Sequence, residues 1–532
     1  MSRADSTSST EREQLLSRLS AKTDGWDFIV TGGGASGLGI ALEAVSRGYS
    51  VLLLERFDFA KGTSSRSTKL VHGGVRYLAQ GNIRLVREAS IERGYLLRNA
   101  PHLVKNQVFL VPVFSWWEKL KYITGLKLYD WIAGRLSLGS SRLLGRKETL
   151  QRLPELKSPR LKGSILYHDG QFDDARLAIS LAQTIREQGG DVINYMEVVG
   201  IRKDNAGQAS ILELTDRETG KRYECAGRTV VNATGVFADE ILRMVNSNHA
   251  DTVRVSQGIH LVLDRKFFSS QEALMIPETS DGRVLFAVPW HDKLVVGTTD
   301  TAISSHSVEP VALEEEIRFI LDTAAIYLRQ PPVRSDVLSV YAGLRPLAAP
   351  SGNGVKTKEI SRSHKILVSP SGIFTMIGGK WTTYRRMAED MIDLVEKTKG
   401  LKPTTSVTST LPVYGSVPAG SVNFNDPLYC YGADRELISA RITGSGKPWI
   451  SEAFGVHEET IRWAVEQEFA RTPEDVLARR TRVLFLDARA AKSLALPVAR
   501  VMAGLLDRNE DWISSETSAF EKLCDSYLPA SV

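Results

Sequence analysis

The sequence predicts an α/β protein that also contains an antiparallel sheet and ends in a helical C-terminal domain. A strand–helix–strand pattern over residues 27–56 indicates a parallel sheet, and short alternating strands over residues 253–300 are typical of an antiparallel one. Residues 401–425 are rich in Pro, Gly, Ser and Thr, as linkers are, and helical patterns follow them. A chain of 532 residues exceeds one compact core, so two or three domains are expected.

The composition is that of an ordinary globular protein, with 42% hydrophobic and 24% charged residues and a net charge of +5. This charge does not indicate a nucleic-acid partner, and it does not oppose an anionic substrate or an acidic lipid surface. The scattered cysteines Cys225, Cys430 and Cys524 have no metal-binding or CxxC spacing. We therefore predict a reducing compartment and no disulfide scaffold. No apolar run is long enough to span a bilayer.

The first 24 residues are rich in Ser, Thr and charged side chains. They do not have the apolar region of a secretory signal peptide. We therefore expect residues 1–24 to form a disordered or weakly helical lead-in, with ordered structure from Trp26 onward.

A glycine-rich turn joins the first predicted strand, residues 27–31, to the first helix. Gly32 permits the tight turn, Gly34 lets the backbone approach a pyrophosphate, and Gly37 lets the helix pack on the strand. Glu55 ends the second strand, where a carboxylate accepts hydrogen bonds from an adenosine ribose. The pattern predicts a dinucleotide site at the helix N-terminus, and the acid favours FAD or NAD over NADP.

Two further turns favour FAD. The strand end NATG, residues 232–235, resembles the second nucleotide-proximal turn of FAD oxidoreductases with the glutathione-reductase-like fold. A third turn, GGK at residues 378–380, precedes a helix predicted over residues 382–397. The N-terminus of that helix would stabilise negative charge on a reduced flavin. The three turns in this order predict FAD.

A polar run, TSSRSTKLVHGGVRY at residues 63–77, follows the second strand. Its hydroxyls are short donors for the flavin pyrophosphate and ring edge, and its Gly-Gly pair permits close approach to the ring. We predict a flavin-contact segment, within which Arg66 has no catalytic role.

Several stretches resemble one known family. They are GGGASGLGIALEAVSRG, TSSRSTKLVHGGVRYL, LYHDGQFDDARL, VNATGVFAD, VPWHDKLVVGTTD, YAGLRPL and GGKWTTYR. Together they resemble the FAD-dependent, quinone-linked glycerol-3-phosphate dehydrogenases and the similar glycerol-3-phosphate oxidases. EDVLARRTRVLFLDARAA resembles the helical C-terminal domain of that family, and the resemblance extends over residues 26–500.

The resemblance implies oxidation of sn-glycerol 3-phosphate to dihydroxyacetone phosphate. The hydrogen on carbon 2 passes to flavin N5 as a hydride, the neighbouring hydroxyl loses a proton, and a membrane quinone receives the electrons. The first alternative is an oxidase that forms hydrogen peroxide, but family oxidases usually carry a mid-chain insertion that is not apparent here. Further alternatives are an amine or amino-acid oxidase on the same fold and a non-catalytic FAD-stabilised scaffold.

The resemblance also implies a domain order. FAD-binding pieces alternate along the chain with pieces of a substrate domain built on the antiparallel sheet. The predicted domains are the lead-in (1–24), an oxidoreductase region (25–410) with FAD-binding pieces at 25–105, 165–255 and 336–400 and substrate-domain pieces at 106–164 and 256–335, and a helical domain (411–532).

The substrate chemistry selects the candidate site residues within the family motifs. A phosphate dianion needs fixed cations, and Arg345 and Arg362 are expected near it. Lys380 is expected beside the flavin and the substrate oxygen. His260 is the first candidate for general base, His72 the second and a water beside an arginine the third. The remaining predicted residues are, for the substrate, Arg76 and Tyr77 and, for the cofactor, Gly32, Gly34, Ala35, Ser36, Gly37, Glu55, Thr63, Ser64, Ser65, Ser67, His72, Gly73, Gly74, Val198, Ala233, Thr234, Gly235, Gly379, Lys380, Thr382 and Thr383.

HDGQFDDARL, residues 168–177, contains the acids Asp169, Asp173 and Asp174. Paired acids in isolation suggest acid–base or metal chemistry. Acidic side chains are also stabilising at the N-terminus of a helix, and a helical pattern follows these residues. We therefore predict a helix cap and no metal site.

SWWEKLKYITGLKLYDWIAGR, residues 115–135, combines Trp, Tyr and Lys, which suit a bilayer interface. Its apolar residues occur on several sides of the helical wheel, so a packed helix at a domain edge is an alternative. An oligomer interface is another, and a homo-oligomer is left open. Because the family is monotopic, the resemblance implies a cytoplasmic protein attached here to the inner face of the cell membrane.

Overall fold

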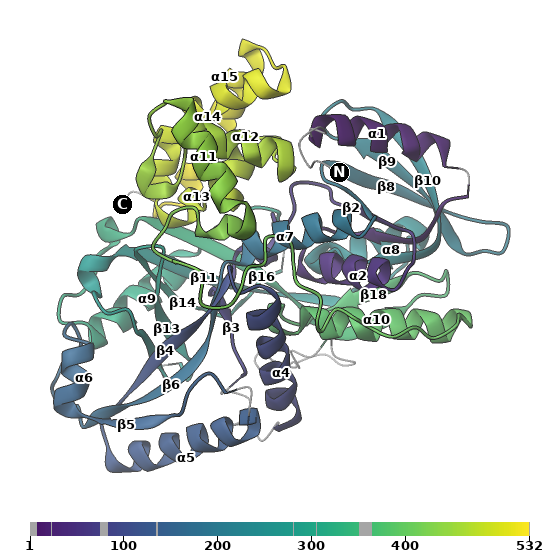
Figure 1. Ribbon diagram of the computed structural model, residues 1–532. Coiled ribbons are helices and arrows are strands. Elements are labelled where there is room, and N and C mark those ends of the chain that lie inside the picture. The colour runs from purple at the N-terminus through teal and green to yellow at the C-terminus, as the bar shows by residue number, and fades with distance from the viewer. Residues whose placement is uncertain are drawn as a thin grey trace.

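The computed structural model describes residues 8–22, 24–74, 83–134, 137–279, 281–304, 306–349 and 364–530. Its strands form two sheets, and the C-terminal helices form a separate cluster at the top of Figure 1. Within these described ranges, no helix combines the length and the hydropathy that a bilayer span requires.

The eight-stranded sheet begins with the predicted strand–helix–strand unit. Its order is β17-β18-β10-β1-β2-β7, and β8 and β9 extend it from β10. The central strands run parallel, so their carboxyl ends meet at one edge, where α/β sheets bind ligands. The strands are β1 (Trp26–Thr31), β2 (Val51–Leu54), β7 (Asp191–Ile193), β8 (Met196–Lys203), β9 (Ala209–Asp216), β10 (Arg222–Asn232), β17 (Lys365–Val368) and β18 (Phe374–Ile377).

Helices cover both faces of this sheet. On one face, α2 (Ala35–Ser46) packs against both α7 (Asp174–Glu187) and α10 (Tyr384–Lys399). The opposite face is covered by α8 (Ala238–Val245), by β8 and β9, and by α1 (Ser8–Ala21). Side chains alternate between the two faces along each strand, so both cores are apolar.

Helix α1 agrees with the helical alternative for the lead-in, but its packing corrects the expectation that ordered structure begins at Trp26. Leu15 and Leu19 lie one helical turn apart and are both buried against the sheet. Arg12 donates a hydrogen bond to Asp216 at 2.9 Å. These contacts are made to residues about 200 positions away, so the local composition did not indicate them.

The ten-stranded sheet has the order β15-β11-β14-β13-β12-β4-β6-β3, with β16 on β11 and β5 on β6. Its pairs within the described chain are antiparallel except for β4 with β12. The strands are β3 (Leu70–Val71), β4 (Val104–Val113), β5 (Arg142–Gly145), β6 (Gly163–Phe172), β11 (Val253–Asp264), β12 (Ala273–Ile276), β13 (Leu285–Trp290), β14 (Lys293–Gly297), β15 (Thr301–Ala302) and β16 (Ser339–Ala348).

Three strands of this sheet differ from the predicted division of the chain. β3, β6 and β16 fell within the predicted FAD-binding pieces, yet they pair in the ten-stranded sheet. The domain boundaries themselves stay a prediction. The helices that pack on this sheet or along its edges are α4 (Ile83–Asn99), α5 (Trp116–Ala133), α6 (Arg146–Arg152) and α9 (Glu314–Tyr327).

The C-terminal domain packs on the ten-stranded sheet through an apolar cluster that includes Tyr341 and Phe485. Its helices are α11 (Arg435–Ser445), α12 (Glu458–Gln467), a π-helix (Asp475–Arg480), α13 (Val483–Leu486), α14 (Ala488–Leu506) and α15 (Glu510–Ser526). The short 3-10 helices among the described residues are η1 (Thr63–Ser65), η3 (Gly235–Phe237), η4 (Arg265–Phe267), η5 (Arg334–Asp336), η7 (Trp381–Thr383), η8 (Tyr429–Asp434) and η9 (Glu452–Phe454). The α/β architecture and the helical C-terminal domain are thus confirmed.

Candidate active site

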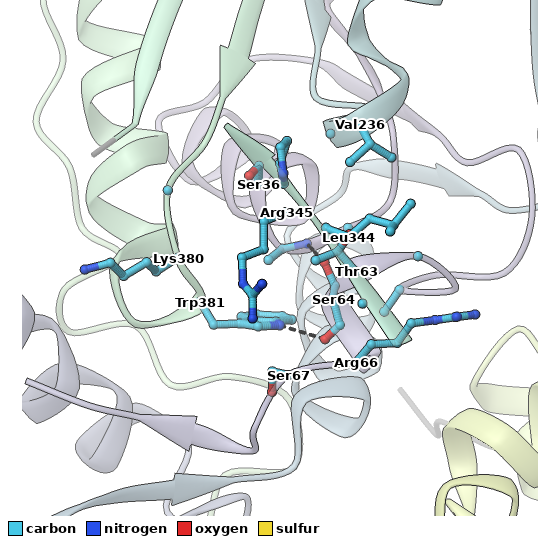
Figure 2. Close-up of a pocket in the computed structure, with 18 of the residues that line it drawn as sticks. Ser36, Thr63, Ser64, Arg66, Ser67, Val236, Leu344, Arg345, Lys380 and Trp381 are labelled. Carbon is cyan, nitrogen blue, oxygen red and sulfur yellow. Dashed lines mark hydrogen bonds between the residues drawn. The ribbon is translucent and has the colours of Figure 1, made fainter. Parts of the chain in front are cut away.

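A cavity of about 610 Å³ lies where the carboxyl edge of the eight-stranded sheet meets the ten-stranded sheet (Figure 2). This volume is in the range of cofactor and ligand sites. The three predicted turns form part of its wall, and β11 and β16 form another part. The wall includes these predicted residues: Gly32, Gly34, Ala35, Ser36, Glu55, Thr63, Ser64, Ser67, His72, Val198, Ala233, Thr234, Gly235, His260, Arg345, Gly379, Lys380 and Thr382.

The first glycine turn has the geometry that the motif predicts. Gly32 has a φ of 103°, and a Cβ there would lie 2.6 Å from the carbonyl oxygen of Ala233. A Cβ on Gly37 would lie 1.8 Å from the carbonyl oxygen of Gly32, so Gly37 serves helix packing and is not in the cavity wall. Gly34 precedes α2, whose first turn has no side-chain cap. An uncapped helix start beside a cavity fits a dinucleotide pyrophosphate.

Glu55 lies at the end of β2 and in the cavity wall. Its carboxylate accepts hydrogen bonds from the backbone amides of Gly33, at 2.6 Å, and Phe57, at 2.8 Å. Burial raises the pKa of Glu55, and the two amides oppose that shift. The carboxylate therefore orders the glycine turn, and its predicted contact with the adenosine ribose stays a prediction.

The hydroxyls of the flavin-contact segment have different partners. Ser64 Oγ accepts a hydrogen bond from the amide of Ala35 at 2.9 Å, which ties the segment to the start of α2. The indole of Trp381 donates to the Ser64 carbonyl at 2.7 Å (Figure 2). Thr63 Oγ1 donates to the Leu344 carbonyl at 2.5 Å. The segment is thus joined to the first glycine turn, the third glycine turn and β16.

Some predicted cofactor residues are not in the cavity wall. Ser65 is buried beneath the segment, and Ser67 Oγ, though in the wall, donates to Asp174 at 2.7 Å. Gly73 lies under α5, because a Cβ there would be 2.1 Å from the Tyr129 hydroxyl oxygen. The predicted residues outside the wall are Gly37, Ser65, Gly73, Gly74 and Thr383.

His260 and Arg345 point to the same side of the ten-stranded sheet. In the β11–β16 register, His260 pairs with Tyr341 and Ser256 with Arg345, so both side chains alternate onto one face. Gly258 lies between them, and a Cβ there would be 2.2 Å from Nη2 of Arg345. The guanidinium therefore lies over Gly258 in the cavity wall.

The guanidinium of Arg345 is fixed by a loop that follows β14. Nη2 donates to Thr298 Oγ1 and to the Thr299 carbonyl, both at 3.1 Å. Nη1 donates to Asp300 Oδ1 at 3.3 Å. These partners belong to the VGTTD stretch, whose role the sequence did not indicate.

His260 is buried beside Thr68, with 2.8 Å between its Nε2 and Thr68 Oγ1. Its ring stacks on Tyr341, with 4.9 Å between ring centroids. Burial, together with the charges of Lys69 and Arg345, lowers the pKa of His260 well below its usual value. The imidazole is therefore neutral at physiological pH, as a general base must be.

The other predicted cationic and base residues lie around the same cavity. Lys380 lines it, but its side chain extends away from Arg345 in Figure 2. His72 is half-buried in the wall. Arg66, given no catalytic role, is buried and donates to Glu309 at 2.5 Å. The predicted substrate residues Arg76, Tyr77 and Arg362 lie outside the described residues, and their roles stay predictions.

The acids of HDGQFDDARL have more than one role. Asp173 caps α7 as predicted, because it accepts a hydrogen bond from the Arg176 amide at 3.1 Å. Asp174 instead binds the flavin-contact segment, and Asp169 accepts from the Gly73 amide at 3.0 Å. Asp174 also binds Arg482 of the C-terminal domain, at 2.9 Å. The clustered acids were the available sequence signal for these contacts.

The chain matches two known families. Residues 27–385 match the family described as FAD dependent oxidoreductase. Residues 377–512 match the C-terminal domain of alpha-glycerophosphate oxidase.

Relatives match over most of the chain. The human mitochondrial glycerol-3-phosphate dehydrogenase is 37% identical over 538 residues, which is 94% of this chain and 72% of the relative. The enzyme of the same name from Schizosaccharomyces pombe is 36% identical over 92% of this chain and 86% of its own length. The mitochondrial glycerol-3-phosphate dehydrogenase SDP6 of Arabidopsis thaliana is 37% identical over 90% of this chain and 83% of its own length.

Solved structures agree with these matches. The glycerol-3-phosphate dehydrogenase of Bacillus halodurans, solved in complex with FAD, superposes with a TM-score of 0.79 at 29% identity over 98% of this chain and 99% of that one. The uncapped start of α2, the glycine turns and the buried carboxylate of Glu55 also fit FAD. The chain belongs to the family of FAD-dependent glycerol-3-phosphate dehydrogenases, and its cofactor is FAD.

Proposed function

We propose that this chain oxidises sn-glycerol 3-phosphate to dihydroxyacetone phosphate and passes the electrons to a membrane quinone. The observation that carries the proposal is that Arg345 and His260 lie on the same face of the β11–β16 pair, in the wall of the cavity that the glycine turns also line. A fixed cation and a neutral imidazole are the groups that a phosphorylated alcohol requires. The names of the relatives support this choice of substrate.

Arg345 binds the substrate phosphate in this proposal. Its Nη atoms are oriented by Thr298 and Asp300, and its side chain keeps about a fifth of its surface exposed. A planar guanidinium held in this way can bind two phosphate oxygens at once. Lys380 lines the same cavity, and the family resemblance supports Arg362 and Arg76, which lie outside the described residues, as further proposed substrate-binding residues.

His260 accepts the proton of the C2 hydroxyl. Bound FAD supplies the acceptor for the C2 hydrogen and its two electrons, so the C2–O bond becomes a carbonyl as the O–H bond breaks. His260 is neutral and lies in the cavity wall near Arg345, which favours it over His72 as the base. His72 lies next to Gly73 in the flavin-contact segment, where we place it against the cofactor.

A membrane quinone as the electron acceptor is supported by a group of apolar residues in the cavity wall. They are Phe109, Tyr167, Met275, Val284 and Phe286. They belong to an apolar cluster that also includes the inner face of α5. Apolar side chains in the cavity wall that pack toward α5 suit a quinone ring, whereas oxygen requires no such lining.

Helix α5 is the proposed membrane contact. Its inner residues Leu126 and Tyr129 are buried, whereas Trp117 and Trp131 are 81% and 78% exposed. This double apolar pattern explains why the helical wheel shows apolar residues on several sides. The outer face also carries Trp116, Leu120, Lys121, Lys127 and Leu128.

The location of that membrane is also part of the proposal. The resemblance predicted the inner face of the cell membrane, whereas the names of the relatives place those proteins in mitochondria. We also propose two finer features of the fold. The FAD-binding domain is of the glutathione-reductase-like class, and the substrate domain is built on the ten-stranded sheet.

Anaerobic mixing with glycerol 3-phosphate tests the oxidation. The yellow absorbance of the bound flavin should bleach in one turnover, and glycerol without phosphate should leave it unchanged. A flavin that stays oxidised at saturating glycerol 3-phosphate would overturn the proposal. Turnover with a soluble quinone analogue, compared with turnover in oxygen alone, separates the dehydrogenase from the oxidase.

A further inference from the structure

Thr68 lies in the cavity wall next to His260, although its position in the sequence gave no reason to single it out. Its Oγ1 is 2.8 Å from Nε2 of His260. The other ring nitrogen, Nδ1, is buried and has no hydrogen-bond partner among the described residues. A nitrogen that is closed off from the cavity cannot receive a proton from a substrate there. The geometry therefore favours Nε2 for proton transfer, and its lone pair faces Thr68 in the tautomer that carries the ring proton on Nδ1.

We propose that Thr68 is a further catalytic residue, whose hydroxyl carries the proton from the C2 hydroxyl of the substrate to Nε2 of His260. A threonine hydroxyl donates one hydrogen bond and accepts others, so it can serve both neighbours at once. The O–H bond of the substrate breaks as a new O–H bond forms at Oγ1, and the original Oγ1 proton bonds to Nε2. Thr68 ends neutral and His260 ends as the cation. This inference rests on the proposed function.

The residues on both sides of Thr68 are held by one buried carboxylate. Ser67 donates to Asp174 through its hydroxyl at 2.7 Å and through its amide at 3.1 Å. The ammonium of Lys69 lies 2.8 Å from the same Asp174 oxygen and 2.6 Å from the Ser65 carbonyl. These contacts fix the backbone on both sides of Thr68 and place its hydroxyl between the cavity and Nε2, so the proposed proton path runs through that hydroxyl.

The backbone of Lys69 is a second sign that this short segment is constrained. Its φ is 63°, in the left-handed region that side-chain-bearing residues rarely adopt. Such a conformation is unfavourable and persists only where surrounding contacts fix it. Here the ammonium of Lys69 lies among the rings of Trp290, Tyr341 and Phe485. Its Nζ atom is no more than 5.2 Å from the centroid of each ring.

The C-terminal domain completes this arrangement. Nη2 of Arg482 donates to Asp174 at 2.9 Å and to the Ser65 carbonyl at 3.0 Å. Arg482 is buried, so its guanidinium has no water to replace these partners. Arg482 and Asp174 are thus positioning residues for Thr68, and they act through Ser67 and Lys69.

The test compares Thr68→Val, which keeps the shape and removes the hydroxyl, with Thr68→Ser, which keeps the hydroxyl. Thr443→Val on the exposed face of α11 is the matched control. The rate of anaerobic flavin reduction by glycerol 3-phosphate is measured by stopped flow, with flavin content and melting temperature recorded for each variant. We expect Thr68→Val to slow reduction by about 10²-fold with nearly unchanged substrate affinity, and Thr68→Ser to stay within about fivefold of the wild type.

A second measurement is independent of turnover. In enzyme labelled with 15N-histidine, the His260 resonance should report the tautomer with the proton on Nδ1, and Thr68→Val should perturb that resonance. A His260 resonance that is the same in both proteins would overturn the relay. Equal losses of rate in Thr68→Val and Thr68→Ser would also overturn it, because the loss would then come from altered packing and not from the missing hydroxyl.

The outcomes separate this inference from the proposed function. If His260→Asn abolishes reduction while Thr68→Val reduces at the wild-type rate, the base assignment stands and the relay is overturned. If His260→Asn also reduces at the wild-type rate, the base assignment fails, and the relay fails with it. If wild-type flavin is not bleached by glycerol 3-phosphate, the proposed function itself fails.

Discussion

Nη1 of Arg345 lies 3.3 Å from the carboxylate of Asp300, and this contact orients the guanidinium in the cavity wall. Arg345→Ala should raise the KM for glycerol 3-phosphate on the order of 10²-fold, because a charge-assisted phosphate contact is lost. Arg345→Lys keeps the charge and should raise KM less. Steady-state kinetics with flavin quantification measure this, and Arg202→Ala, in an exposed ion pair, is the control. Loss of FAD from Arg345→Ala with normal KM in the remaining holoenzyme would contradict the assignment.

The approach of Gly34 to the pyrophosphate is tested by Gly34→Ala. A Cβ at this position would meet Ser64 Oγ at 2.9 Å and no other described atom closer than 4.0 Å, so the chain should still fold. The methyl group should obstruct the cofactor and weaken FAD binding by about tenfold or more. Fluorescence titration of the FAD-free protein measures this, and Gly444→Ala, which meets open space in α11, is the control. Unchanged FAD affinity would place the pyrophosphate elsewhere.

The outer face of α5 is tested by the double variant Trp117→Ser, Trp131→Ser. Both side chains are largely exposed, so the fold should be unaffected, whereas partition onto vesicles should fall by about tenfold or more. Cosedimentation with vesicles that contain anionic lipid measures this. Leu437→Ser, an exposed apolar residue on α11, is the matched control. Equal binding by the double variant and the wild type would remove α5 from the membrane contact.

The environment of His260 determines how the rate of flavin reduction should change at low pH. Its pKa is lowered by burial and by Lys69 and Arg345, so the ring stays neutral as pH falls through the usual value of 6.5. A base works only while it is unprotonated, so the rate of flavin reduction should not decline near pH 6.5 but only at lower pH. Stopped-flow reduction across this range measures it. A decline centred on pH 6.5 would indicate an exposed histidine as the base.

Acid stability should depend on the ion pairs between the FAD-binding region and the C-terminal domain. Burial alone would raise the pKa of Glu474, but Lys61 and Arg479 hold it at about 2, below its ordinary value of 4.5. The folded state therefore binds this proton less readily than the unfolded state. The stabilisation is present above pH 4.5 and is lost as pH falls toward 2.

Glu474→Gln tests this pair. The variant should be less stable than the wild type by roughly 2 kcal/mol at neutral pH, and the difference should shrink as pH falls through that window. Thermal melts across the pH range measure it, and the exposed Glu436→Gln is the control. A difference that does not vary with pH would mean that Glu474 acts through packing.

Local features of the site were predictable from the sequence because their chemistry is local. The roles of Gly32 and Gly37 follow from the short distance between a tight turn and the helix after it, which holds wherever the motif occurs. Glu55 follows from the fixed length of the strand–helix–strand unit. The resemblance to known family motifs then supplied Arg345 and His260, which spacing alone did not.

Contacts between distant segments were not predictable in this way. Thr68 and His260 are 192 residues apart, and Asp174 and Arg482 are 308 residues apart. Whether Ser67 faces a cofactor or a carboxylate depends on how its segment packs against distant parts of the chain, such as Asp174 of α7. No local sequence pattern indicates this packing. The packing of helix α1 was missed for the same reason, because its order comes from burial of Leu15 and Leu19 against the sheet.

The arginines of the π-helix and the turn after it have a consequence for the order in which the protein matures. Asp58 is buried and binds Arg480 at 2.9 Å, and Asp174 binds Arg482. On the ribosome Asp58 emerges 422 residues before Arg480, whereas Asp174 already has the earlier Lys69 as a partner. The buried carboxylate of Asp58 therefore has no cationic partner among the described residues until the π-helix has been synthesised, and a chain that terminates before Arg479 should be released without a usable flavin site.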